Sequence, residues 1–102
     1  MIHVLATIEL VSGRRAEFLK EFRALIPLVR DEEGCLEYDA AVDVPTLLPA
    51  QPPVRDDVVM VVEKWRDLAA LEAHLMAPHM LAYRGRVKEM VTGTVIQVLE
   101  PA

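Results

Sequence analysis

One segment, Val58–Trp65 (VVMVVEKW), restricts the fold more than any other part of the chain. Valine occupies four of its eight positions, and branching at Cβ favours extended backbone over helix. A near-continuous apolar run of this length is typical of a strand that is covered on both faces. The fold must therefore place a layer of side chains on each side of this strand.

Three further strands are predicted from their sequence patterns. Apolar and polar residues alternate along the first of them, which is typical of a strand with one buried face. The segments are residues 2–11, 35–42 and 92–100.

The remaining segments have helical features. Residues 14–33 carry an apolar stripe at the spacing of a helix. Pro27 lies within that stripe, and because it lacks an amide donor we expect a kink or an early end there. Asp67 is suited to cap a short helix over residues 68–76, and Pro78 is suited to the first position of another.

The order of these elements is β-α-β-β-α-β, the ferredoxin-like arrangement of an α+β fold, in which helices cover one face of an antiparallel sheet. By its size, the chain of residues 1–102 is predicted to be a single domain. Its hydrophobic content of 53% exceeds the usual value of about 45–50%. This excess favours an apolar pocket, and a second copy that covers the open face of the sheet in a twofold homodimer.

Residues 43–57 form the longest predicted connection. They contain four prolines, which exclude a central strand. Long surface loops of this kind often cover a site.

Composition argues against several classes of partner and location. The net charge of −5 argues against binding to nucleic acid, and no apolar stretch approaches the length of about 18 residues that spans a membrane. The start of the chain has no basic segment before a long apolar run, so we expect no signal peptide. Cys35 is the single cysteine and cannot form an internal disulfide, which fits a reducing cytoplasm.

Glu63 and Trp65 are the first candidates for a functional site. They lie two positions apart on the predicted strand, so they share a face with Val61. A carboxylate among apolar neighbours should have a raised pKa, which suits a general base near neutral pH. The alternatives are a Glu63 held by an arginine or a backbone amide and a Trp65 that only packs, rather than one that forms the flat wall of a cavity.

His74 and His79 are candidates for proton transfer, because imidazole titrates near cellular pH. A hydrogen-bonded structural role is the alternative. Their spacing of five does not put two ligands on one helix face, so we expect no metal site. Tyr83 shares a helix face with His79, and Met60 and Met80 could add flexible walls to a cavity or simply fill the core.

Three motifs, in this order and spacing, resemble the antibiotic biosynthesis monooxygenase family, and its bacterial quinol monooxygenases in particular. They are Gly34-Cys35-Leu36-Glu37-Tyr38, Glu63-Lys64-Trp65, and His74 followed by Ala77-Pro78-His79. The resemblance covers essentially the whole chain. It implies a ferredoxin-like fold, a dimeric α/β barrel built from two sheets, and a cavity between sheet and helices.

The resemblance also implies an activity. Monooxygenases of this family react a quinol or a polyketide phenol with molecular oxygen, without flavin, haem or metal, so no cofactor is expected. The implied proton-transfer groups are His74, His79 and Glu63, and the implied contacts to a small aromatic substrate are Trp65, Tyr83, Met60, Met80 and Val61. Val61 stands where the polyketide oxygenases carry an asparagine. The chain has no asparagine at all, so haem degradation, which also uses one, is not expected.

Two other functions stay open. The segment from His74 to His79 also resembles family members that isomerise a small phosphorylated metabolite. Such an isomerase would need a basic pocket, for which the candidates are Arg55, Arg84, Arg86 and Lys88. The third possibility is a non-enzymatic dimer that only binds a small molecule.

Overall fold

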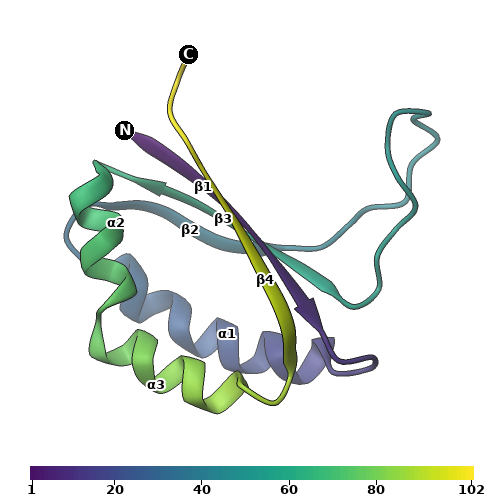
Figure 1. The fold of residues 1–102 in the computed structure, drawn as a ribbon, viewed down its shortest axis with the longest axis horizontal. Coiled ribbons are helices and arrows are strands. Elements are labelled where there is room, and N and C mark those ends of the chain that lie inside the picture. The colour runs from purple at the N-terminus through teal and green to yellow at the C-terminus, as the bar shows by residue number, and fades with distance from the viewer.

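The computed structural model describes residues 1–102 and contains four strands and three helices (Figure 1). Their order is β1 (Ile2–Leu10), α1 (Arg15–Arg30), β2 (Cys35–Ala41), β3 (Val58–Trp65), α2 (Leu68–Leu75), α3 (Pro78–Val87) and β4 (Val91–Leu99). The strands form one antiparallel sheet in the order β2-β3-β1-β4. This confirms the predicted ferredoxin-like α+β fold.

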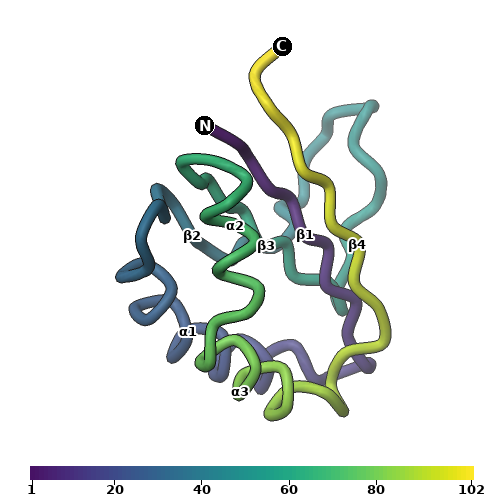
Figure 2. The backbone as a smooth tube through the Cα atoms, turned by 60° about the vertical axis from the view of Figure 1, so that its left-hand side comes forward, coloured from purple at the N-terminus to yellow at the C-terminus, as the bar shows by residue number.

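All three helices lie on one side of the sheet (Figure 2). Buried and less buried residues alternate along β1 and β3, the two central strands, and the buried ones face the helices. Phe18, Phe22 and Leu25 of α1 are almost completely buried against them. The hydrophobic core therefore lies between the helix layer and the centre of the sheet.

Helix α1 ends earlier than predicted, but not at Pro27. It continues to Arg30, and the amide of Asp31 donates to the Pro27 carbonyl. Because Pro27 has no amide hydrogen, the carbonyl of Arg23, one turn earlier, lacks its helical hydrogen bond. Arg23 is exposed, so water can donate to this carbonyl instead. Of the two predicted effects of Pro27, a kink or an early end of the helix, the early end is therefore wrong. The residues after Arg30 form a turn into β2.

The second crossover contains two helices, as predicted. Asp67 caps α2 by accepting a hydrogen bond from the Ala70 amide at 2.9 Å, and Pro78 occupies the first turn of α3. The two helices follow one another along the sheet (Figure 2). They bring the end of α2 and the start of α3 close to the turn between α1 and β2. None of the helices is both long and apolar enough to cross a membrane.

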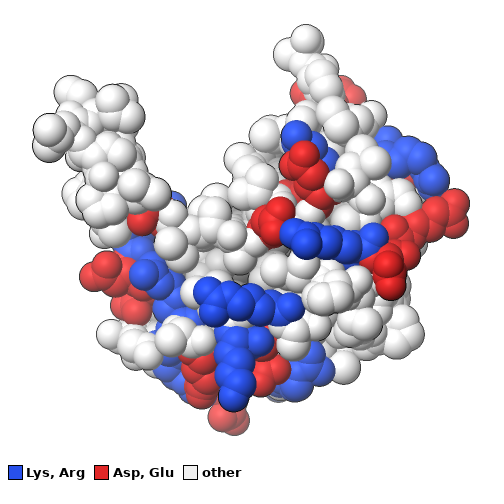
Figure 3. All heavy atoms as spheres, turned by 180° about the vertical axis from the view of Figure 1, so that it is seen from behind, with Lys and Arg blue, Asp and Glu red and all other residues white.

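Residues 42–57 project from the body of the molecule as an arm without helix or strand (Figure 1). Its tip is free of charged side chains (Figure 3), and Leu47 is completely exposed. The sheet face that points away from the helices is also largely apolar in its centre. Leu5, Met60, Val62 and Val95 lie on that face, as the strand register shows.

Candidate active site

A cavity of about 420 Å³ lies between the helix-facing side of the sheet and the helices α2 and α3. Eleven of the sixteen residues that line it are hydrophobic, so a ligand there would bury mostly apolar surface. The volume is within the range of about 300–1,000 Å³ that is usual for small-molecule sites. The few polar atoms of the lining therefore decide what chemistry the cavity can support.

Glu63 is the carboxylate of this cavity. Strand alternation directs it and Trp65 to the helix side, where the Trp65 Nε1–H donates to Glu63 Oε1 at 2.8 Å. Burial raises the pKa of Glu63 to about 7; the Trp65 hydrogen bond lowers it and the charge of Glu32 raises it. The group is thus close to half ionised at neutral pH, as a general base should be.

His74 is the second side chain of the cavity that can accept a proton. Its ring packs on Trp65 at a centroid distance of 4.6 Å and edge-on to Tyr38 at 5.3 Å. Its Nδ1 lies 2.8 Å from Glu32 Oε2, and because a carboxylate accepts, Nδ1 carries the proton. Burial lowers the pKa of His74, which favours the neutral ring, and a neutral ring with its proton on Nδ1 has Nε2 as an acceptor.

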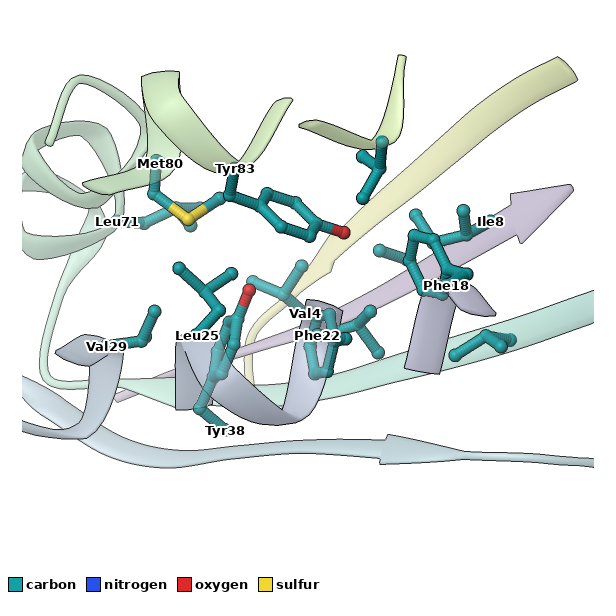
Figure 4. Packing of buried hydrophobic residues seen from close by; sticks show 14 of the residues in the cluster. Val4, Ile8, Phe18, Phe22, Leu25, Val29, Tyr38, Leu71, Met80 and Tyr83 are labelled. Carbon is teal, nitrogen blue, oxygen red and sulfur yellow. The ribbon is translucent and has the colours of Figure 1, made fainter. Parts of the chain in front are cut away.

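Among the polar atoms of the cavity that have no hydrogen-bond partner within the protein are Glu63 Oε2, His74 Nε2 and the hydroxyls of Tyr38 and Tyr83. No fully buried side-chain nitrogen or oxygen lacks a partner, so these atoms reach open space. Figure 4 shows the two tyrosine rings extending from β2 and α3 into the region between helices and sheet. Burial raises the pKa of both hydroxyls, which keeps them as donors. Glu63 and His74 therefore offer two acceptors to a ligand and the tyrosines two donors, beside the cationic side chains of Arg84 and Lys88.

Five of the predicted site residues line this one cavity. They are Glu63, His74, Val61, Met80 and Tyr83.

Three other predicted site residues do not line it. Trp65 is completely buried and packs against the lining residues Glu63, His74 and Tyr38. His79 lies outside the cavity, with its Nε2 at 2.8 Å from Glu32 Oε2. Met60 points to the opposite face of the sheet, where its sulfur accepts a hydrogen bond from Thr7.

The placements of Trp65 and Met60 correct two predicted contacts. Met60 is an odd number of positions away from Val61 and Glu63, so the alternation of the strand excludes it from their face. Trp65 is on the helix-facing side of the sheet, but its ring is completely buried and does not reach the cavity. Neither residue forms a wall of the cavity.

Sequence reasoning missed the contacts of Glu32 with His74 and His79. Glu32 sits in the run Asp31-Glu32-Glu33, which is typical of a solvated helix end. Its partners are 42 and 47 positions away, so no local spacing could have indicated the contact. No group of three or more His, Cys, Asp or Glu side chains is arranged to hold a metal ion.

Comparison with known proteins identifies the family. Residues 1–86 match the family described as antibiotic biosynthesis monooxygenase. The chain belongs to this family. It is 39% identical over 103 aligned positions to the probable quinol monooxygenase YgiN of Escherichia coli (strain K12), covering 99% of this chain and 98% of that protein.

Solved structures of similar chains have the same fold. PA3566 from Pseudomonas aeruginosa superposes with a TM-score of 0.81 at 29% identity, covering 99% of this chain and 93% of that one. Rv0793 from Mycobacterium tuberculosis superposes with a TM-score of 0.80 at 26% identity, covering 99% and 94%. A monooxygenase-type function thus follows from membership of the antibiotic biosynthesis monooxygenase family.

Proposed function

We propose that this chain is a cofactor-independent monooxygenase that acts on a quinol or a similar aromatic phenol. The observation that carries the proposal is Glu63, whose pKa is about 7 and whose free Oε2 faces an apolar cavity. The 39% identity to a protein named a probable quinol monooxygenase supports the substrate class.

The proposed reaction needs proton acceptors more than it needs redox groups of the protein. Glu63 Oε2 and His74 Nε2 accept the two hydroxyl protons of a quinol, which makes the ring electron-rich. The ring transfers electrons to molecular oxygen, and a ring carbon forms a bond to one oxygen atom. The O–O bond then breaks, and the second oxygen leaves as water with the two protons returned by Glu63 and His74. The ring C–H proton ends on the new hydroxyl, so quinol and oxygen give hydroxyquinone and water.

The other lining residues have supporting roles in this proposal. Tyr83 and Tyr38 donate hydrogen bonds to the oxygens of the ring or to the developing peroxide. Val61 and Met80 provide apolar walls that exclude water from the reduced oxygen species. Trp65 holds Glu63 in place through the Nε1–H bond.

The test is oxygen uptake by the purified protein with a reduced naphthoquinone, in the presence of a metal chelator and without added flavin. Uptake above the rate without enzyme, with one labelled oxygen atom in the product when ¹⁸O₂ is supplied, is expected. Glu63→Gln should lower the rate by about a hundredfold. Glu72→Gln is the matched control, because it makes the same change of carboxylate to amide at an exposed position of α2 outside the cavity. Equal rates in wild type and Glu63→Gln would refute the role of Glu63.

A second candidate function is isomerisation of a small phosphorylated metabolite. Of the four predicted cations, Arg84 and Lys88 line the cavity and neither forms an ion pair. The other two are paired elsewhere, Arg55 with Asp43 and Arg86 with Glu21. Phosphate competition separates the candidates. If inorganic phosphate binds to wild type but not to Lys88→Met, and no oxygen is consumed, the isomerase is favoured. Binding of naphthoquinone without turnover favours a binding protein.

We also propose that the chain is a homodimer that pairs the open faces of two sheets. The apolar centre of this face and the uncharged tip of the arm lack a cover within one chain. Val95→Asp, in the open face, should shift the mass in light scattering from dimer to monomer. Leu28→Asp, on an exposed position of α1, is the control that should leave the mass unchanged. A wild-type monomer would refute the pairing.

A further inference from the structure

Glu32 joins three elements that are distant in the sequence. It lies in the turn between α1 and β2, and its Oε2 is 2.8 Å from Nδ1 of His74 in α2 and 2.8 Å from Nε2 of His79 in α3. Both rings therefore share one carboxylate oxygen. A surface ion pair rarely has this geometry, because long side chains lose freedom when they are fixed from two sides.

Burial changes along this chain of contacts. The His74 side chain is 2% exposed, that of Glu32 is 14% exposed, and that of His79 is 24% exposed. Only His74 lines the cavity. Glu32 thus contacts His74 from outside the cavity, and His79, the most exposed of the three, contacts Glu32 on the solvent side.

The contact decides which nitrogen of His74 faces the cavity as an acceptor. A neutral imidazole has one donor and one acceptor, and either nitrogen can carry the proton. The carboxylate of Glu32 accepts at Nδ1, so Nδ1 is the donor and Nε2 is the free acceptor. With the opposite tautomer the cavity would meet an N–H group, which cannot accept a proton from a substrate hydroxyl.

The surroundings of His74 shift its pKa in opposite directions. Burial lowers its pKa most, the hydrogen bond and charge of Glu32 raise it, and the neighbouring His79 and Arg84 lower it. Glu63, the carboxylate that lines the cavity, also has its pKa raised by the charge of Glu32. Removal of the charge on Glu32 should therefore leave His74 a weaker base and Glu63 a stronger acid.

We propose that Glu32 is a positioning residue that holds His74 as the Nδ1–H tautomer, so that Nε2 faces the substrate, and that His79 acts through Glu32 rather than on the substrate. The inference rests on the proposed monooxygenase function for the identity of the proton that His74 accepts. That proton comes from a quinol hydroxyl and returns from Nε2 to the oxygen that leaves as water. His79 supplies the second hydrogen bond that fixes the shared oxygen.

The first test needs no substrate. Nitrogen-15 NMR of the imidazole rings at about pH 8 distinguishes the two tautomers, because the protonated and bare nitrogens have different shifts. We expect His74 to be the Nδ1–H tautomer in wild type and in Glu32→Gln, whose amide oxygen still accepts. In Glu32→Leu we expect a mixture. An Nε2–H tautomer in wild type, or an unchanged tautomer in Glu32→Leu, would overturn the proposal.

The second test uses oxygen uptake. Glu32→Gln should lower kcat by about tenfold with little change in KM, because it keeps the tautomer but loses the charge that stabilises the imidazolium. Glu32→Leu should lower kcat by about a hundredfold. His79→Ala should lower kcat by about as much as Glu32→Gln does. The control is His3→Ala, which changes the histidine of β1 outside the cavity and should leave kcat unchanged.

The outcomes separate the two proposals. If wild type consumes no oxygen, the proposed function fails, while NMR still decides the role of Glu32. If wild type is active and Glu32→Leu folds with unchanged kcat and an unchanged pH profile, the positioning role is refuted. If His79→Ala abolishes activity while Glu32→Leu does not, His79 acts directly on the substrate, and the inference is again overturned.

Discussion

The buried carboxylate of Glu63 gives a quantitative prediction about stability. Its pKa rises from 4.5 to about 7 because burial disfavours the charged form. The unfolded chain therefore loses this proton near pH 4.5, while the folded chain keeps it until about pH 7. Glu63 therefore contributes fully to stability below about pH 4.5, and this contribution is lost as pH rises from 4.5 through about 7. At about 1.4 kcal/mol for each pKa unit, the loss is about 3 kcal/mol at mildly alkaline pH.

Glu63→Gln removes this titration but keeps an oxygen that can accept the Trp65 Nε1–H bond. Urea unfolding should give nearly equal free energies for variant and wild type near pH 4.5, the unfolded pKa. At about pH 8 the variant should be more stable by about 3 kcal/mol. Glu72→Gln, on an exposed position of α2, is the control and should show no such trend. A difference between Glu63→Gln and wild type that is the same at both pH values would refute the reasoning.

Three further predictions concern packing and the environment of Glu63. Gly34→Ala should lower the free energy of unfolding by about 2 kcal/mol, measured by urea unfolding, because φ is +83° and an added Cβ would lie 2.6 Å from that of Ala70. Gly13→Ala, at φ +81° with open space around it, should lower the free energy of unfolding by less. Equal decreases in the two variants would contradict the steric argument. Trp65→Phe removes the hydrogen bond that lowers the pKa of Glu63, so the pH midpoint of oxygen uptake should rise; an unchanged midpoint would count against that bond. Leu25→Ala, at a completely buried position, should lose about 3 kcal/mol in the same unfolding measurement, whereas Leu28→Ala, at an exposed one, should lose under about 0.5 kcal/mol.

The fold could be predicted from the sequence because its signals are local. The alternation along β1, the apolar stripe of α1 and the start of α3 at Pro78 each lie within one element. The error at Pro27 also has a local cause. Pro27 lies in the last turn of α1 on its exposed side, where water can bind the Arg23 carbonyl in place of the missing amide, and the helix continues to Arg30.

The site could be predicted only where the same local rules apply. Glu63 and Val61 share a face because they are two positions apart, and both line the cavity. Met60 could have been excluded by the same rule. Glu32 could not have been found, because its contacts depend on how the turn after α1 meets the helices of the second crossover. The complete burial of Trp65, which packs on His74 of another element, likewise depends on packing between elements.

The most direct test of the account is the pH dependence of kcat/KM for oxygen uptake with a reduced naphthoquinone, after subtraction of the rate without enzyme. This parameter reports the ionisation of the free enzyme. We predict a rise with pH whose midpoint is about 7, the pKa of Glu63, and the loss of this rise in Glu63→Gln. A midpoint near 4.5, the ordinary value for glutamate, or the same profile in Glu63→Gln, would contradict the claim that Glu63 is the base of the cavity.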